Sequence, residues 1–354
     1  MLTLIVPGLI WPHQALLDLT CGLELPAFTT LLGYGRVTRS AQSSAYDALA
    51  KSLGLPCPLP VAALRAQAGG YATQTDDWLC LDPVNLQLNK DRVVVGNPET
   101  LALTELEAHQ LAAALAPTFS AFGEMKVLTS THWILQLAAA SRSATDTAPA
   151  LPNFTPLPGV IGRSAAPLPS GAAYRPWHAA LNEAQMTLHS HPVNQARAAA
   201  NRPVVNSLWP WGGGRLSRLL TPQLAAPGGI ACERIIASDL VAQGAARFFD
   251  VPAEPLPGQY PGPNAATDMR SALVMYDSLD TPARSGDALV WQEALHTLET
   301  GWLTPLLAEL RAGRLDALRL IAPGETHSCE ITLSRRQLWQ FWRRPAPLTV
   351  LATS

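Results

Sequence analysis

The chain has 354 residues, of which 48% are hydrophobic and 15% are charged, and its formal net charge is -2. This length is enough for one large or two ordinary domains with substantial cores, and the composition excludes an intrinsically disordered protein. The weak net charge provides no global electrostatic footprint for nucleic acid, so we expect no nucleic-acid partner.

Cysteine usage and hydropathy predict a soluble cytoplasmic protein of bacterial type. The cysteines are odd in number, widely spaced and without a Cys-x-x-Cys pair, as is typical of reduced thiols in a cytosol. The apolar run at residues 2–10 has no basic segment before it and contains Pro7 and Gly8, which favours a buried strand over a signal peptide. No later apolar run is long enough to cross a bilayer, so we expect no membrane partner.

The first part of the chain predicts an isolated strand followed by a small α+β unit. We expect the strand at residues 2–6, a helical segment at 26–32 and a proline-rich break at 55–60. Residues 71–137 form the small unit, in which a Thr104-x-x-Glu107 capping box and an apolar face predict a helix at 104–115. The strands expected in this unit are at 78–88, 92–95 and 127–137.

The second part of the chain predicts alternating helices and strands. Residues 138–175, rich in Ala, Pro, Ser and Gly, predict a linker or long surface loop. The elements expected after it are helices at 176–200 and 238–248, strands at 204–209, 229–237, 271–276 and 315–321, and a long helix around 295–310 that Pro305 kinks. Because the strand at 2–6 must join a later sheet to bury both faces, residues 1–60 and 176–354 should form one core, a three-layer α/β sandwich.

The densest group of polar side chains lies between residues 186 and 215. Arginine forks and amide groups suit phosphate or carboxylate recognition, and a triple glycine lets backbone amides approach an anion. No carboxylate lies between His189 and Arg215, so the expected ligand is a small anion. The candidate ligand-binding residues are His191, Asn194, Arg197, Asn206, Trp209, Gly212, Gly213, Gly214 and Arg215.

The same residues fit a second interpretation, a structural polar network that joins a helix to a sheet. A tight turn with positive φ also requires glycine, and tryptophans commonly serve as core material. We expect no metal at His189 and His191, because residues two apart point to different sides of a helix. The sequence leaves the anion site and the structural network open.

Three runs carry a resemblance to a known family. They are His191-Pro-Val-Asn-Gln-Ala-Arg197, Val205-Asn-Ser-Leu-Trp-Pro-Trp-Gly-Gly-Gly-Arg215 and Ser238-Asp-Leu-Val-Ala-Gln-Gly244. Through them, residues 186–310 resemble the archaeal-type cofactor-independent phosphoglycerate mutases of the alkaline-phosphatase superfamily, which implies an alkaline-phosphatase-like core. Over most of its length the chain is similar to a shorter bacterial set, the RpfE-type regulatory proteins, through Trp78-Leu-Cys-Leu-Asp82-Pro-Val and Asn182-Glu-Ala-Gln-Met186.

The resemblance also implies a catalytic set, much of which is replaced here. Mutase chemistry needs two divalent metals that hold a Ser or Thr nucleophile and a phosphoryl group in line. Where the family has Asp-Gly after its first strand, this chain has Val6-Pro7-Gly8, and no convincing nucleophile follows. The family's Asp-x-x-x-His pair corresponds to Asp280 and Arg284, and a guanidinium cannot ligate a cation. Of the family's C-terminal Asp-His element only His327 remains.

These replacements imply a catalytically degenerate protein with a regulatory or small-anion-binding role, no catalytic residue, no metal or other cofactor, and a small anion or a protein as partner. The alternative is a metal-dependent phosphoglycerate mutase or another phosphoryl-transfer enzyme with an altered site. A further alternative is a residual single-metal hydrolase that uses the remaining polar residues. Those residues are Asp277, Asp280, Glu325 and His327.

The C-terminal region combines four arginines with three aromatic residues. This composition is typical of an amphipathic helix with a charged rim, and a basic aromatic patch is the second interpretation. A few arginines supply too few phosphate contacts to dominate affinity for nucleic acid. The residues are Arg335, Arg336, Trp339, Phe341, Trp342, Arg343 and Arg344.

Overall fold

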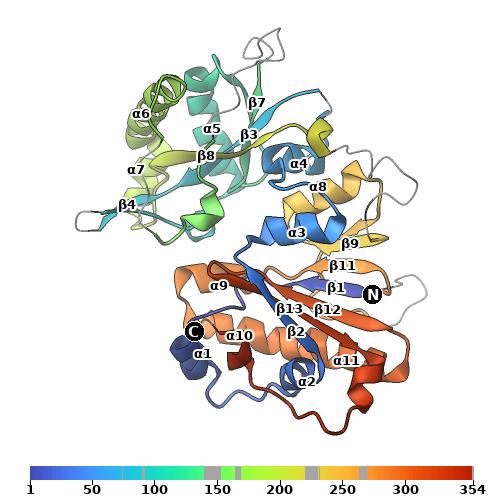
Figure 1. The fold of residues 1–354 in the computed structure, drawn as a ribbon. Helices are drawn as coiled ribbons and strands as arrows, with labels where there is room; N and C mark the ends of the chain where they lie inside the picture. The colour runs from blue at the N-terminus through green and yellow to red at the C-terminus, as the bar shows by residue number, and fades with distance from the viewer. Residues whose placement is uncertain are drawn as a thin grey trace. The chain divides into compact units, whose positions relative to one another are not determined.

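The chain divides into two units, one of which interrupts the other. The core unit contains Met1–Pro58 and Pro222–Ser354, and the inserted unit contains Leu59–Thr221 (Figure 1). The computed structural model describes residues 1–73, 75–89, 92–138, 153–163, 169–219, 230, 232–262 and 269–352. Each unit has its own sheet, so we describe them separately.

The core unit is built on a seven-stranded mixed sheet with the order β10-β9-β11-β1-β12-β13-β2. Strand β1 is buried on both faces and lies between β11 and β12, parallel to both, as its largely apolar sequence predicts. Only β13 runs antiparallel to its two neighbours. The strands are β1 (Leu2–Ile5), β2 (Arg36–Ala41), β9 (Arg234–Ala237), β10 (Ala253–Glu254), β11 (Ala272–Met275), β12 (Ala317–Ala322) and β13 (His327–Ser334).

Helices cover both faces of this sheet, as expected of an α/β sandwich. Helices α3 and α8 lie on one face, and α2, α10 and α11 lie on the other (Figure 1). The second face contains the main apolar core, in which leucines of β1 and β12 pack on Trp291 and Trp302. The helices are α1 (His13–Thr20), α2 (Pro26–Tyr34), α3 (Ala45–Leu53), α8 (Leu240–Phe248), α9 (Asp280–Ser285), α10 (Ala288–Leu298) and α11 (Thr304–Ala312).

The long helix expected around residues 295–310 is interrupted, as the proline within it predicts. A π-helical turn, Glu299–Leu303, separates α10 from α11, and Pro305 lies in the first turn of α11. In that turn the buried Glu299 carboxylate accepts hydrogen bonds from the backbone amides of Ala27 and Phe28, at 2.6 and 2.9 Å. The Glu299 carboxylate therefore satisfies backbone N–H groups in the first turn of α2 that have no acceptor within the helix.

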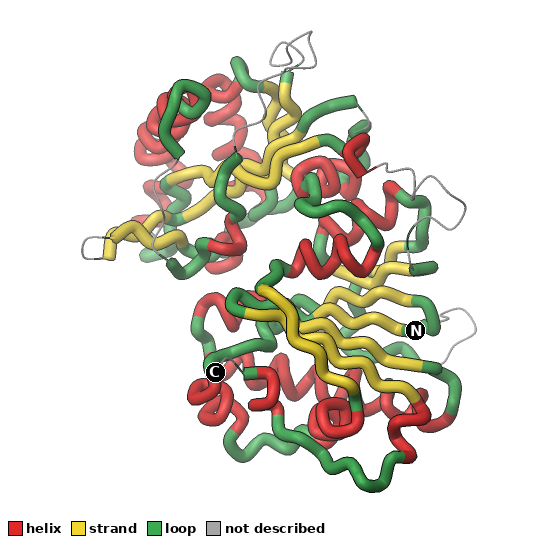
Figure 2. Tube along the Cα trace, viewed as in Figure 1, coloured by secondary structure: helices red, strands yellow, loops and turns green. Residues whose placement is uncertain are grey.

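The inserted unit contains a four-stranded sheet with the order β6-β7-β3-β8 and a separate hairpin, β4–β5. The hairpin extends away from the sheet (Figure 2). The strands are β3 (Trp78–Val84), β4 (Leu86–Asn89), β5 (Arg92–Val95), β6 (Gly123–Val127), β7 (Trp133–Leu137) and β8 (Ser207–Gly214). The helices are α4 (Val61–Ala68), α5 (Glu105–Phe119), α6 (Arg175–Ser190) and α7 (Pro192–Ala199).

Several boundaries differ from those expected. The strand expected at 127–137 is the antiparallel pair β6–β7, which turns at residues 128–132. The helix expected at 176–200 is two helices, because Pro192 cannot continue α6. Most of the expected linker at 138–175 lies outside the described residues, and the described part contains a short 3₁₀ helix, Leu157–Gly159.

The domain boundary at residue 176 also needs correction. Residues 176–221 were expected in the core with residues 1–60, but they belong to the inserted unit. The reason is strand pairing, since β8 forms an antiparallel ladder with β3 from Trp78 to Val84. Within the described residues, no helix is both long enough and apolar enough to span a membrane.

Candidate functional site

The polar motif of residues 186–215 is divided between α6, α7 and β8. His191 stands between the two helices and caps α7, because its Nδ1 accepts the Val193 amide at 3.2 Å. His189 lies in the last turn of α6 and faces a pocket. The two imidazoles therefore have different surroundings and different roles.

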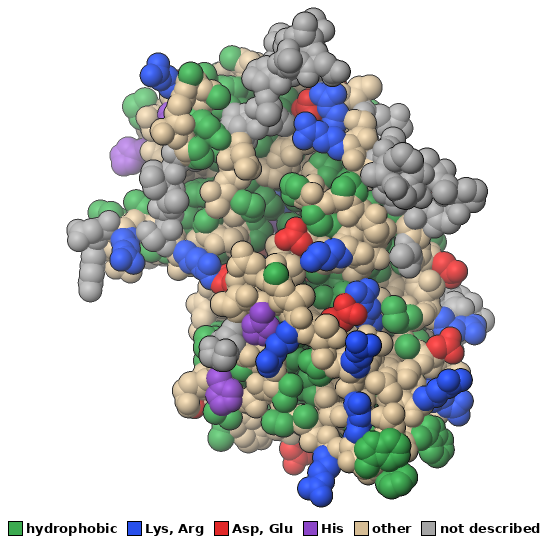
Figure 3. Space-filling model, viewed as in Figure 1, with side chains coloured by type: hydrophobic (Ala, Val, Ile, Leu, Met, Phe, Trp, Pro, Cys, Tyr) green, Lys and Arg blue, Asp and Glu red, His purple; other side chains and the backbone are tan. Residues whose placement is uncertain are grey.

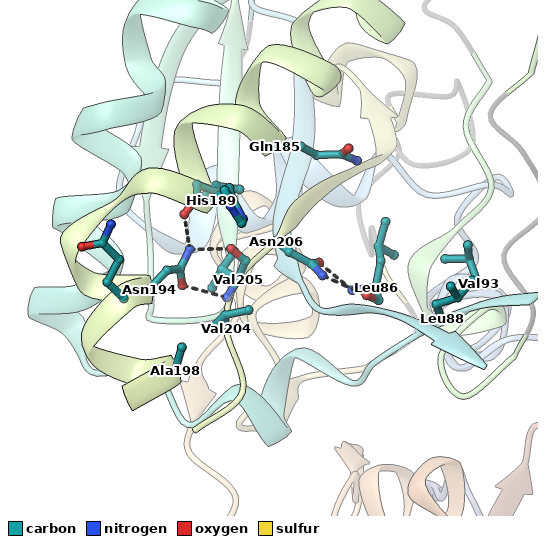
Figure 4. A pocket seen from close by; sticks show the side chains of 12 residues that line it. Leu86, Leu88, Val93, Gln185, His189, Asn194, Ala198, Val204, Val205 and Asn206 are labelled. Carbon is teal, nitrogen blue, oxygen red and sulfur yellow. Dashed lines mark hydrogen bonds between the residues drawn. The ribbon is translucent and has the colours of Figure 1, made fainter. Parts of the chain in front are cut away.

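Asn194 and Asn206 both use their amide groups on the backbone (Figure 4). The buried Asn194 donates to the carbonyls of Leu188 and Val205, at 2.8 and 2.7 Å, and accepts from the Val205 amide at 3.1 Å. Asn206 accepts from the Leu86 amide at 2.7 Å and donates to the Leu86 carbonyl at 2.8 Å. Each side chain thus replaces a missing backbone partner.

Arg197 is the most enclosed cation of the motif, with 1% of its side chain exposed. Its Nε donates to the Pro203 carbonyl at 2.8 Å, its Nη1 to Glu107 at 2.9 Å and its Nη2 to the Leu101 carbonyl. Burial acts to raise the pKa of Glu107, but the Thr104 amide and the Arg197 guanidinium outweigh it and hold that pKa below its ordinary value. Arg197 therefore joins α7 to the start of α5.

Trp209, Gly212 and Gly214 of β8 are packed into the inserted unit. Trp209 donates through Nε1 to the Thr155 carbonyl at 2.9 Å. Gly212 and Gly214 have φ values of +61° and +150°, and a Cβ on either would lie 2.9 Å from a side-chain atom of Val61 or Pro60, respectively. Close packing on α4 thus explains these two glycines, whereas Gly213 is exposed.

Arg215 is engaged by Asp77 in a two-pronged ion pair. Its Nε lies 2.9 Å from Oδ1, and its Nη2 contacts Oδ2. The hydrogen bonds that Arg215 donates to Asp77 raise the pKa of Arg215 above its ordinary value. This pairing fixes the end of β8 to the segment that leads into β3.

A pocket of about 820 Å³ lies beside this motif, between the β4–β5 hairpin and helices α6 and α7 (Figure 4). Of the predicted ligand-binding residues it is lined only by Asn194 and Asn206, and His189 also faces it. Neither Arg197 nor Arg215 lines it. Its walls are largely aliphatic, with Leu86, Leu88 and Val93 on the hairpin side.

A deeply buried charged pair of the inserted unit, Arg65 and Asp82, was not among the predicted site residues. Arg65 donates through Nη1 to both oxygens of Asp82, and its guanidinium carbon lies 4.9 Å from the ring centroid of Trp211. Asp82 also accepts from the Trp211 indole at 2.8 Å and from the Trp133 amide at 3.1 Å. The only sequence signal was a charged residue inside an otherwise apolar strand.

The second candidate place is the edge of the core sheet where β1, β9, β11, β12 and β2 end. Ligands of open α/β sheets commonly bind at such an edge. Val6-Pro7-Gly8 follows β1 and supplies no carboxylate. Asp280, at the start of α9, accepts from Arg284 Nε at 2.9 Å.

Other polar groups at this edge also have protein partners. His327 Nε2 lies 3.1 Å from the Leu351 carbonyl oxygen, and the hydroxyls of Ser43 and Ser328 lie 2.6 Å apart. Asp239 caps α8 and accepts from the Tyr46 hydroxyl at 3.1 Å. Throughout the described residues, which include Asp277, Asp280, Glu325 and His327, no three His, Cys, Asp or Glu side chains are grouped so as to hold a metal ion.

Comparison with known proteins gives a fold and no activity. No family model and no curated protein matches the chain. The PH0037 protein from Pyrococcus horikoshii is 11% identical, with a TM-score of 0.51 over 94% of this chain and 87% of that one. A cofactor-independent phosphoglycerate mutase from Thermoplasma acidophilum DSM 1728 is 14% identical, with a TM-score of 0.40 over 94% and 90%. The first likeness shows a shared overall fold.

Proposed function

We propose that the chain is a catalytically degenerate protein of phosphoglycerate-mutase-like architecture, which acts in regulation by binding rather than by turnover. The Asp280–Arg284 ion pair is the observation that carries this proposal. At these positions the resembling enzymes pair Asp with His. A guanidinium bound to the carboxylate competes with a divalent cation for its oxygen and brings a positive charge to the same place.

The turn after β1 supports the same proposal. Pro7 stands where the resembling family has a metal-binding Asp, and proline offers neither a charge nor a side-chain donor atom. The turn is tightly packed, since a Cβ on Gly8 would lie 2.4 Å from the Leu279 carbonyl oxygen. Two substitutions at separate elements of the sheet edge thus remove ligands from one catalytic set.

We further propose that the motif of residues 191–215 is a structural network and not an anion site. An anion that bound Arg197 would have to displace Glu107 and two carbonyl oxygens from a side chain that is almost fully enclosed. Loss of buried hydrogen bonds costs about 1–3 kcal/mol for each unsatisfied group. A regulatory ligand or protein partner therefore binds elsewhere.

A metal-retention and turnover assay tests the proposal. Purified protein dialysed after exposure to Mn²⁺ or Zn²⁺ should retain no stoichiometric metal and should not interconvert phosphoglycerates in the presence of Mn²⁺ or Mg²⁺. The Asp280→Asn variant is the matched control, because it should leave both readings unchanged. Two retained equivalents together with mutase turnover in the wild type, lost in Asp280→Asn, would establish the enzymatic alternative instead.

A further inference from the structure

The segment after β13 exposes three aromatic rings on the core unit. The 3₁₀ helix η6 (Arg335–Trp339) buries none of its side chains. Trp339, Phe341 and Trp342 are 75%, 88% and 66% exposed. The amphipathic helix expected here is therefore not formed, because the segment is a 3₁₀ turn whose rings face solvent. Clustered exposed rings usually mark an interaction site.

The backbone holds this segment, the aromatic loop (residues 334–344), in a defined conformation. Gln337 Oε1 accepts from the Ser334 amide at 2.8 Å and closes a capping box at the start of η6. At the other end Arg343 Nη1 donates to the carbonyls of Tyr34 and Gly35, at 2.8 and 3.0 Å. The rings are thus presented by a loop that is tied to the core unit at both ends.

Positive charge surrounds the rings. Arg335, Arg336, Arg343 and Arg344 belong to the same loop, and in the described part of the chain none of them forms an ion pair with a carboxylate. A concavity of about 450 Å³ beside Trp339 is lined by Arg335, Arg336, Ser334, Gly313 and one carboxylate, Asp316. Apolar side chains gather at the lower edge of the core unit, with Lys and Arg side chains nearby (Figure 3).

We propose that the aromatic loop binds the surface of anionic phospholipid bilayers. The three rings enter the interfacial region, where amphipathic aromatic side chains are favoured. The exposed Arg335, Arg336 and Arg344 contact lipid phosphates, and the concavity lined by Arg335 and Arg336 receives one headgroup. Ring insertion and basic attraction together supply the two signals that stable peripheral binding requires. This proposal departs from the expectation that no membrane is among the partners, and it does not depend on the proposed function.

The size and shape of the patch favour a bilayer over a macromolecular partner. The three rings expose on the order of 500 Å², less than the roughly 800 Å² that each partner contributes to a standard protein interface. Phe341 and Trp342 pack edge to face, with centroids 5.1 Å apart and planes at 81°. They form a ridge instead of the parallel platform on which nucleic-acid bases stack.

Vesicle co-sedimentation of the full chain tests the proposal. The protein should pellet with vesicles of phosphatidylcholine containing about one third phosphatidylglycerol, and not with pure phosphatidylcholine, and added salt should weaken binding. The Phe341→Ala/Trp342→Ala variant should bind at least tenfold more weakly. Arg335→Gln and Arg336→Gln should each lower affinity roughly fivefold.

Matched surface variants distinguish binding at this site from nonspecific adsorption to vesicles. Leu289→Ala removes an equally exposed apolar side chain (77% exposed), and Arg218→Gln removes an exposed arginine; both should bind as the wild type does. All variants should unfold as the wild type does, because the changed side chains are on the surface. The proposal is overturned if anionic vesicles do not bind, or if Phe341→Ala/Trp342→Ala binds normally. It is also overturned if the loop instead drives self-association or binds single-stranded oligonucleotide without binding vesicles.

Discussion

Arg65 donates to both carboxylate oxygens of Asp82, at 3.0 Å from Oδ1 and 2.8 Å from Oδ2, within the buried interior of the inserted unit. Because Asp82 also accepts from the Trp133 amide and the Trp211 indole, one carboxylate joins α4, β7 and β8 through β3. Removing one partner of such a pair leaves the other charge buried and uncompensated.

We expect Asp82→Asn to destabilise the inserted unit by about 3–5 kcal/mol. Urea unfolding followed by tryptophan fluorescence measures this change. Replacement of both partners, Arg65→Met with Asp82→Asn, should cost less than Asp82→Asn alone, since no unpaired charge remains and the amide oxygen still accepts a hydrogen bond. Equal losses for the single and double variants would contradict this account of the pair.

Arg197→Lys should lower the free energy of unfolding by about 2 kcal/mol or more, because an ammonium cannot reach Glu107 and two carbonyls at once. Arg202 is the matched control. It contacts the same Glu107, but its side chain is 42% exposed, so Arg202→Lys should cost less than about 1 kcal/mol. Calorimetry with phosphoglycerates should show no binding to the wild type. Binding that Arg197→Lys abolishes without loss of stability would restore the anion site.

His132 should remain neutral well below its ordinary pKa. Desolvation and the nearby Arg65 charge lower its pKa to about 4, against an opposing effect of Asp82. The folded pKa lies below the ordinary value of 6.5, so the imidazole of the unfolded chain takes up a proton at a higher pH than that of the folded protein. The contribution of His132 to the free energy of unfolding is therefore fully present above about pH 6.5 and is lost as the pH falls towards 4. NMR titration of the imidazole measures the pKa directly. The His132→Gln variant should lose less stability over this window, and an imidazole that titrates near 6.5 would contradict the prediction.

Asn206→Ala should loosen the β4–β5 hairpin, because both hydrogen bonds between the Asn206 side chain and the Leu86 backbone disappear. Amide exchange at Leu86 should accelerate by roughly tenfold. Gln195→Ala is a suitable control, since Gln195 lines the same pocket but its side chain donates to the nearby Ser190 carbonyl and not to the hairpin. Unchanged exchange in Asn206→Ala would show that the hairpin is held by other contacts.

The elements with strong local signals were predicted correctly. The strand at β1 and its place inside the sheet of the core unit follow from an apolar run that must be buried on both faces, and the Thr104–Glu107 capping box starts α5 as expected. Strands β2 and β13 were missed. Strand β2 is polar and mostly exposed at the sheet edge, and β13 begins at His327, inside the motif compared with the mutase metal ligands.

The candidate site was harder to predict, because its residues find distant partners. Arg197 looks like an anion clamp in its own segment, but its acceptor Glu107 lies 90 positions earlier in the chain. Asn206 likewise bonds to Leu86, 120 positions away. A sequence shows which donors are present, and only the tertiary fold shows which acceptors already occupy them.

The contact between Pro60 and Gly214 places the beginning of the inserted unit beside its end. A segment whose two ends adjoin can be gained, exchanged or lost in one genetic event without disturbing the order of elements in its host. The inserted unit therefore has the geometry of a segment that can be exchanged as a whole. If such an exchange has occurred, some relatives of this chain should share the β1–β11–β12 arrangement of the core unit. In place of residues 59–221 these relatives would carry an unrelated segment.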